Sequence, residues 1–208
     1  MGIRLQRHVR SLRNVVLDVR FGGRFLGGGA PTRFAHLHAH AVANSDYLAM
    51  EEVFGRASIT DNSVIVDVGC GKGRVINFLL SRGIKCEIIG VEIDPEVASA
   101  TARRLRRYRN VRIVSGNILE QWPQNATLFY VYNPFGAPVV ERFCDRLAAH
   151  PRPFVLLYYN CVHRDIFASR GFRLEFHSRD TVPAFRHRLG DRDMIHDFCI
   201  IQPQGSGA

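Results

Sequence analysis

The sequence predicts an α/β protein with a doubly wound, mostly parallel sheet of seven strands and an antiparallel pair at its C-terminal edge. From residue 63 onward, short apolar runs rich in β-branched residues alternate with segments of helical spacing. The first five runs are mostly apolar, as expected for strands covered by helices on both faces. The last two runs have no helix between them, which predicts the antiparallel pair. The seven runs are Val64–Val68, Cys86–Ile93, Val111–Val114, Leu128–Tyr132, Phe154–Tyr159, Phe172–Phe176 and Met194–Ile201.

The segments between the runs carry helix signals. Val75–Leu80 repeats apolar residues four positions apart, and Gly83 follows as a C-terminal stop. After the second run, Asp94 can cap a helix and Pro95 can open it. This helix is expected to bury Ala98, Ala102 and Leu105 and to expose Arg103, Arg104, Arg106 and Arg107.

Length and composition indicate one globular domain with an appendage. The chain has 208 residues, somewhat more than a typical domain of roughly 150 residues, and 46% of them are hydrophobic. No apolar run approaches the roughly 18 residues of a membrane span, and arginines interrupt any secretory signal. The five cysteines are widely spaced, which excludes a disulfide framework and favours buried thiols. We expect a cytoplasmic protein, monomeric or weakly self-associating.

The charge of the chain is unusual. There are 28 basic and 19 acidic residues, a formal net charge of +9, and only Lys72 and Lys85 are lysines. A basic surface attracts nucleic acid or other polyanions. The same excess of arginine also follows from a GC-rich genome, so both interpretations stay open.

We divide the chain into a basic, Gly-rich N-terminal arm (1–43), a main domain (44–203) and a flexible tail (204–208). Residues 1–33 hold seven arginines and the single acid Asp18. Such a segment is typical of a transit peptide, of an arm over a polyanionic substrate, or of a helix docked on the main domain. The sequence does not choose among the three.

Polar and glycine residues follow consecutive strands of the predicted sheet, where ligands of such sheets bind. Gly69, Gly71 and Gly73 follow the first run, and such a turn lets backbone N–H groups approach a ligand closely. Glu92 ends the second run, nineteen residues beyond Gly73. Its carboxylate can accept hydrogen bonds from both hydroxyls of an adenosine ribose and would repel a 2′-phosphate. Asn117 follows the third run and can meet an adenine amino group.

The run Asp67-Val68-Gly69-Cys70-Gly71-Lys72-Gly73 resembles the first motif of class I S-adenosylmethionine-dependent methyltransferases, which have a Rossmann-like fold. The resemblance covers roughly residues 44–178. It implies S-adenosylmethionine as the cofactor and Glu92 as the ribose ligand, and it places Asn117 where the family usually has Asp. The remaining residues that it implies at the cofactor are Asp46, Tyr47, Asp67, Gly69, Cys70, Gly71, Gly73 and Ile118. Of these, Asp67 would orient the turn or meet the amino group, and Asp46 and Tyr47 would close over the methionine end.

Within this class, three further segments resemble a bacterial group distantly akin to non-SET histone-lysine methyltransferases. They are Asn44–Tyr47, Tyr130–Gly136 and Tyr158–Asn160. Tyr158, Tyr159 and Asn160 either line the acceptor pocket or leave only Asn160 exposed.

The fourth run ends in Asn133-Pro134-Phe135, which resembles the N/D-P-P-Y/F motif of amino-methylating enzymes. The resemblance implies that the Asn133 oxygen accepts a hydrogen bond from the target amine and that Phe135 stacks on a planar acceptor. The second proline of the motif is replaced by Phe135. This difference weighs against a nucleobase as the methyl acceptor and leaves an amine as the acceptor. The alternative is a strand-to-loop turn with a buried aromatic ring.

These observations predict methyl transfer from S-adenosylmethionine to a nitrogen of a protein lysine, an RNA or a small amine. Two other classes stay open, a non-catalytic nucleic-acid-binding module on this fold and a nucleotide-dependent oxidoreductase. His36, His38 and His40 alternate but lack a fourth ligand, so no metal site is predicted. The loop Arg179–Arg192 is either a lid over an anionic substrate or a plain exposed hairpin.

Overall fold

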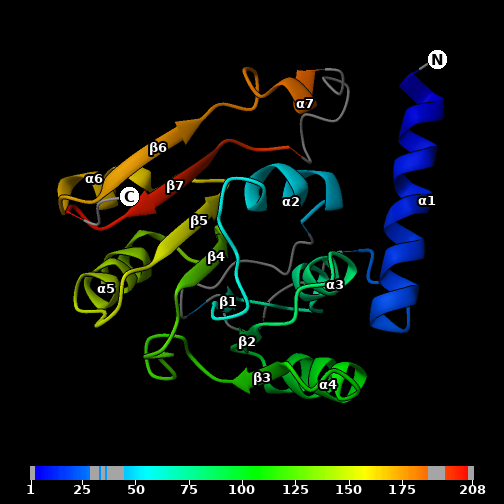
Figure 1. Cartoon of the computed structure of the whole chain (residues 1–208), viewed down its shortest axis with the longest axis horizontal. Coiled ribbons are helices and arrows are strands. Elements are labelled where there is room, and N and C mark those ends of the chain that lie inside the picture. Colours follow the sequence, from blue (N-terminus) through cyan, green and yellow to red (C-terminus); the bar gives the residue numbers. More distant parts are fainter. Residues whose placement is uncertain (1–2, 29–32, 34–35, 37–44, 187–194, 206–208) are drawn as a thin grey trace.

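The computed structural model describes residues 3–28, 33, 36, 45–186 and 195–205. Its centre is a seven-stranded sheet with the strand order β3-β2-β1-β4-β5-β7-β6 (Figure 1). The first five strands run parallel, whereas β7 is antiparallel to both β5 and β6. The predicted sheet and its antiparallel edge pair are therefore confirmed. The strands are β1 (Val64–Val68), β2 (Glu87–Glu92), β3 (Val111–Ser115), β4 (Leu128–Tyr132), β5 (Val155–Tyr159), β6 (Arg173–His177) and β7 (Phe198–Gln202).

Helices cover both faces of this sheet. One core cluster joins the sheet to α2, α3 and α7, and a second cluster joins its other face to α5 and α6. No helix within the described ranges is long and apolar enough to cross a membrane. The helices are α1 (Ile3–Gly22), α2 (Tyr47–Phe54), α3 (Arg74–Ser81), α4 (Pro95–Leu105), α5 (Ala137–Ala148), α6 (Arg164–Ser169) and α7 (Pro183–Arg186).

The short helix α7 corrects the prediction that no helix separates the last two strands. Val182 and Phe185 lie three residues apart and are both buried in the first core cluster. A helical turn is the local conformation that brings residues at this spacing to one face. Burial therefore decides the conformation of a segment that lacks a long helical pattern.

The face of α4 also differs in part from the prediction. Ala98 and Leu105 are buried as expected, but Thr101 is buried where Ala102 was expected, and Ala102 is only half-buried. Arg104 does not simply face solvent, because its guanidinium donates to the carbonyl oxygens of Gly22 and Lys72. The reason is that α1 ends beside α4, and the sequence carried no signal for this contact.

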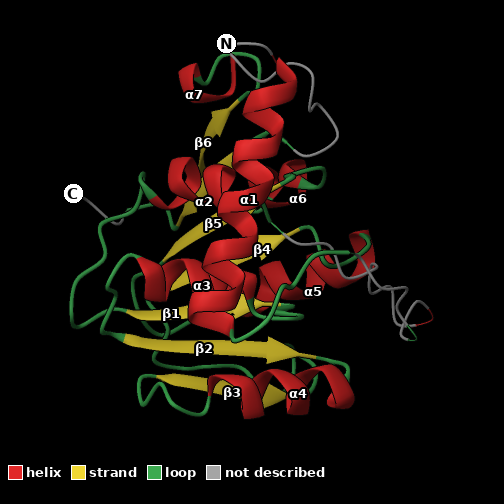
Figure 2. Cartoon of the chain, turned by 90° about the vertical axis from the view of Figure 1, so that its right-hand side faces the viewer, coloured by secondary structure: helices red, strands yellow, loops and turns green. Residues whose placement is uncertain are grey.

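A buried carboxylate fastens α1 to the main domain. The Asp18 side chain is fully buried and accepts hydrogen bonds from Arg74 Nε (3.1 Å), Arg74 Nη2 (2.6 Å), the Tyr47 hydroxyl (2.9 Å) and the backbone N–H of Leu26 (3.0 Å). Figure 2 shows α1 lying across α3. Of the three interpretations of residues 1–33, the docked helix matches what the structure shows for α1.

Candidate cofactor and acceptor site

The turn between β1 and α3 is held against the neighbouring strand. The backbone N–H groups of Gly69 and Cys70 both donate to the Val91 carbonyl oxygen, at 2.9 and 3.0 Å. Gly69 has a φ of +72°, and a Cβ added there would lie 3.1 Å from Cβ of Pro134. Only glycine fits this position, because both the backbone conformation and the close approach exclude a side chain. The turns after β1 and β4 are therefore in direct contact.

Glu92 connects the end of β2 to the glycine turn. One carboxylate oxygen accepts from the N–H of Gly71 (2.8 Å) and the other accepts from the N–H of Asp94 (2.9 Å). The side chain is buried, and this burial raises the pKa of Glu92. A carboxylate has about four acceptor positions, so the two backbone bonds leave capacity for further donors such as ribose hydroxyls.

Asp67 is a buried acid at the centre of the site. Its Oδ2 has no hydrogen-bond partner within the part of the chain that the structure describes. Burial, with a smaller contribution from the charge of Glu92, raises the pKa of Asp67 to about 8. A buried acceptor without a partner is costly, so the site fits a ligand that brings hydrogen-bond donors, such as an ammonium group.

This raised pKa makes a pH-dependent contribution to stability. The folded protein keeps a proton on Asp67 that the unfolded chain loses near pH 4, so stability falls as pH rises from about 4 to about 8. The slope is at most about 1.4 kcal/mol per pH unit for one proton. Asp67→Asn is therefore expected to gain stability relative to the wild type between pH 5 and pH 8. Urea unfolding at several pH values checks this, with exposed Asp61→Asn as control, and a pH-independent difference would contradict it.

The end of β3 lies beside the end of β2, because Ser115 pairs with Glu92 in the parallel register. The Asn117 side-chain oxygen accepts from the N–H of Leu119 at 3.0 Å. Ile118 is buried in the second core cluster. The structure thus brings Asn117 to the same edge as Glu92, and its contact with an adenine stays a prediction.

The turn after β4 brings the three predicted acceptor residues to the glycine turn. Asn133 has a φ of +37°, and its side-chain oxygen accepts a hydrogen bond from the Tyr158 hydroxyl at 3.1 Å. Pro134 makes the close approach to Gly69. Phe135 is half-buried, with its ring centroid 6.0 Å from that of Phe143 in α5. Phe135 therefore packs partly against α5.

Asp46 and Tyr47 begin α2, and both are buried. Asp46 is the N-cap, accepting from the N–H of Leu48 (2.9 Å) and from Asn14 (3.1 Å). The Tyr47 hydroxyl donates to Asp18 and so contributes to the docking of α1. A cofactor contact by either residue stays a prediction.

The chain segment after α1 lies beside this site. Lys72 Nζ donates to the Gly28 carbonyl oxygen at 3.0 Å. Arg33 forms exposed ion pairs with Asp94 (3.2 Å) and Glu96 (3.1 Å) at the start of α4. The N-terminal segment therefore reaches the ends of both β1 and β2.

Sequence reasoning missed Thr101, which contacts the glycine turn. The Thr101 hydroxyl donates to the Gly71 carbonyl oxygen at 2.9 Å, and its place three residues after Ala98 was the signal that could have found it. Tyr158 and Tyr159 are buried, as in the core alternative, whereas Asn160 is half-buried and not exposed.

Other predicted features lie partly beyond the described residues. All five cysteines are buried and free, as expected. His38 and His40 lie outside the described residues, as does much of the loop Arg179–Arg192. Within the ranges that the structure describes, no cluster of three or more metal-ligating side chains occurs.

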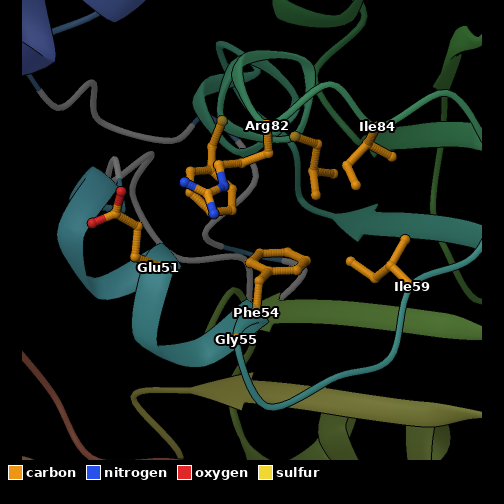
Figure 3. A pocket seen from close by; sticks show the side chains of 8 residues that line it. Glu51, Phe54, Gly55, Ile59, Arg82 and Ile84 are labelled. Atoms are coloured by element: carbon orange, nitrogen blue, oxygen red, sulfur yellow. The ribbon is translucent and has the colours of Figure 1, made fainter.

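A separate cleft of about 380 Å³ lies between α2, α3 and the segments that enter β1 and β2 (Figure 3). Phe54, Ile59, Phe78, Leu79 and Ile84 give it an apolar lining. Because Ile59 and Ile84 precede their strands, the cleft lies at the amino ends of the strands. It is therefore distinct from the glycine turn at their carboxyl ends.

A mostly parallel sheet in this order, with a glycine turn after its first strand and an acid ending its second, is typical of the class I, Rossmann-like methyltransferase fold. Residues 65–153 match the methyltransferase domain family. Residues 65–153 therefore resemble a class I S-adenosylmethionine-dependent methyltransferase domain. Asp67 Oδ2, which has no hydrogen-bond partner among the described residues, and the carboxylate oxygens of Glu92 fit the hydrogen-bond donors of that cofactor.

Curated relatives match the central part of the chain. Over 101 residues the chain is 35% identical to protein-L-isoaspartate O-methyltransferase of Gloeobacter violaceus, covering 48% of this chain and 43% of that protein. Over 76 residues it is 30% identical to ribosomal RNA small subunit methyltransferase A of Syntrophus aciditrophicus, covering 36% and 26%. The chain thus spans less than half the length of these two relatives.

Solved structures share the fold. A methyltransferase from Pyrococcus furiosus has a TM-score of 0.61 at 13% identity, covering 95% of this chain and 97% of that one. An RNA methyltransferase from Salinibacter ruber, in complex with S-adenosyl-L-homocysteine, has a TM-score of 0.55 at 15% identity, covering 80% and 97%.

Proposed function

We propose that this protein transfers a methyl group from S-adenosylmethionine to a nitrogen atom of its acceptor. The observation that carries the proposal is the contact between Gly69 and Pro134. It sets the glycine turn, where the cofactor would bind, against Asn133, which would receive the amine. Neither turn alone distinguishes a methyltransferase from another nucleotide-binding protein, whereas their contact would join the proposed cofactor site to the proposed acceptor site.

The cofactor would be held by backbone and carboxylate groups. The Gly69–Gly73 turn would receive its methionine and ribose portion, Glu92 its ribose hydroxyls, and Asn117 with Ile118 its adenine. Asp67 would accept a donor of the methionine end. When bound, S-adenosylmethionine supplies an electrophilic methyl group on a positively charged sulfur.

The acceptor would be oriented by Asn133. Its amide oxygen accepts a hydrogen bond from the Tyr158 hydroxyl, and an amide oxygen can accept more than one hydrogen bond. An amine N–H donated to this oxygen would aim the nitrogen lone pair at the methyl group. Methyl transfer is an in-line displacement, so such positioning provides much of the rate acceleration.

Thermal unfolding with S-adenosyl-L-homocysteine, NAD or ATP tests the cofactor. A ligand at about 100 times its Kd stabilises the folded state by about 2.7 kcal/mol, which raises Tm by about 5–10 °C for a chain of this length. Only S-adenosyl-L-homocysteine is expected to do so. A shift with NAD alone would favour an oxidoreductase.

Transfer of a labelled methyl group to poly-L-lysine, diaminobutane and ribosomal RNA tests the acceptor. The two named relatives act on protein and on ribosomal RNA, and the net charge of +9 also favours a polyanion, so both classes belong in the panel. Salt-dependent RNA binding without any methyl transfer would favour the non-catalytic binding module instead.

Replacing Asn133 separates its role from that of the cofactor site. Asn133→Ala is expected to lower kcat by about 10- to 100-fold, because one positioning hydrogen bond is lost, while the Kd for S-adenosyl-L-homocysteine changes less than about twofold. Asn133→Gly is expected to change kcat and Kd in the same way. Because glycine tolerates the positive φ at this position, this variant removes the side chain without adding backbone strain. Exposed Asn125→Ala is the control. Equal loss of cofactor binding and turnover would contradict this division of roles.

A further inference from the structure

Three aromatic side chains meet at the carboxyl ends of β4 and β5, directly before the Asn133 turn. Tyr132 and Tyr159 end these strands and pair in register, with ring centroids 5.0 Å apart. His196 lies two residues before β7, whose first residue, Phe198, pairs with Tyr159. The His196 ring centroid is 5.6 Å from that of Tyr132 and 5.4 Å from that of Tyr159. A histidine from the far end of the chain therefore sits at the acceptor edge of the sheet.

Hydrogen bonds link these side chains. The Tyr132 hydroxyl and His196 Nε2 are 3.0 Å apart, and the His196 backbone N–H donates to the Tyr159 hydroxyl at 3.0 Å. The segment that carries His196 is itself held, because the Asp197 carbonyl oxygen accepts from the N–H of Asn160 at 2.8 Å. The imidazole is thus fixed relative to the turn after β4.

The proposed reaction needs a group of this kind when the acceptor is an aliphatic amine. Near neutral pH such an amine is an ammonium ion, which has no lone pair for attack. Histidine is the side chain whose ordinary pKa suits it to accept a proton there. Burial raises the pKa of Tyr132 to about 12, so this phenol can pass a proton along but does not ionise on its own at neutral pH.

We propose that Tyr132 and His196 form a proton relay for an acceptor that arrives as an aliphatic ammonium ion. Tyr132 touches the acceptor, and its hydroxyl oxygen takes the ammonium proton while its own proton moves to His196 Nε2. The electron pair left on nitrogen then forms the N–C bond as the S–C bond of the cofactor breaks, with the electrons leaving on sulfur. His196 returns its proton to solvent. This relay rests on the proposed function and narrows its acceptor to a lysine-like amine.

Among the described residues, tyrosines of β4 and β5 and charged residues next to the ends of β6 and β7 lie around His196. Tyr132 and Tyr159 face it from β4 and β5. Beside it, Asp197 accepts from the N–H of Arg179, and the Arg179 guanidinium donates to the Ile195 carbonyl oxygen at 3.3 Å. Asp197 and Arg179 therefore bind each other and the segment that carries His196, and the Tyr132 phenol is neutral near pH 7.

The test compares wild type, His196→Gln and Tyr132→Phe over pH 6–10, with poly-L-lysine and diaminobutane as probes. His177→Gln, on the edge strand β6, is the matched control. In the wild type, kcat/KM is expected to rise with pH at the midpoint of the His196 imidazole, read by NMR in the S-adenosyl-L-homocysteine complex. At pH 7, both relay variants should lose about 100-fold or more, the usual size of a general-base contribution. The loss should shrink toward pH 10, where the amine deprotonates unaided.

Other results of this test would contradict the relay, the proposed function or both. A loss in His196→Gln of less than about threefold at pH 7, or one equal at pH 7 and pH 10, would show that the residue is only structural. Methylation of ribosomal RNA but of neither amine would overturn the relay and leave the proposed methyl transfer standing. Binding of S-adenosyl-L-homocysteine without transfer to any of the three probes would overturn the proposed function, and the relay with it.

Discussion

Asp18→Ala is expected to lower the free energy of unfolding by about 3–5 kcal/mol, the usual cost of removing one partner of a buried ion pair. Arg74 would keep its buried guanidinium without its counter-ion, and Tyr47 and the N–H of Leu26 would lose their acceptor. Because Arg74 begins α3 directly after the glycine turn, the substitution is also expected to weaken binding of S-adenosyl-L-homocysteine.

Urea unfolding followed by circular dichroism measures the effect. The matched control is Asp145→Ala, which breaks the exposed pair with Arg170 at 2.8 Å and should cost less than about 1 kcal/mol. Asp18→Asn keeps the size and one oxygen acceptor, so an intermediate loss is expected. A loss in Asp18→Ala no larger than that of the control would mean that α1 is not held by this carboxylate.

Glu92→Ala is expected to weaken binding of S-adenosyl-L-homocysteine by about 100-fold or more. Hydrogen bonds to a charged group contribute about 1.5–3 kcal/mol each, and a tenfold change in Kd corresponds to about 1.4 kcal/mol. The substitution removes the proposed acceptors of the ribose hydroxyls. It also releases the N–H of Gly71, which loosens the glycine turn.

Isothermal titration calorimetry checks this prediction. Glu92→Gln separates the two causes, because its amide oxygen can still accept from Gly71 but one acceptor and the charge are lost. The control is Glu87→Ala at the opposite end of β2, where the carboxylate accepts exposed hydrogen bonds from Arg112 (3.4 Å) and Asn125 (3.3 Å). A change in Kd below about threefold for Glu92→Ala would remove Glu92 from the proposed cofactor site.

The sheet was predictable because its central strands are buried on both faces and so appear as mostly apolar runs. β1 and β4 match the predicted ranges Val64–Val68 and Leu128–Tyr132. The predictions were wrong for α7, for the exposed face of Arg104, and for Ala102, which is half-buried while Thr101 is buried. In each case contacts with distant segments decide the conformation or the burial, and local periodicity does not report them.

The sequence by itself determined the fold class, the glycine turn and the strand-end positions of Glu92, Asn117 and Asn133, because these follow from local patterns and from the rule that parallel strands share one carboxyl edge. Only the tertiary structure decided which distant side chains meet there. Asp18 reaches Arg74 across 56 positions, and Tyr132 reaches His196 across 64. The spacing of residues along the chain does not predict such contacts, since they arise from the packing of whole helices and strands.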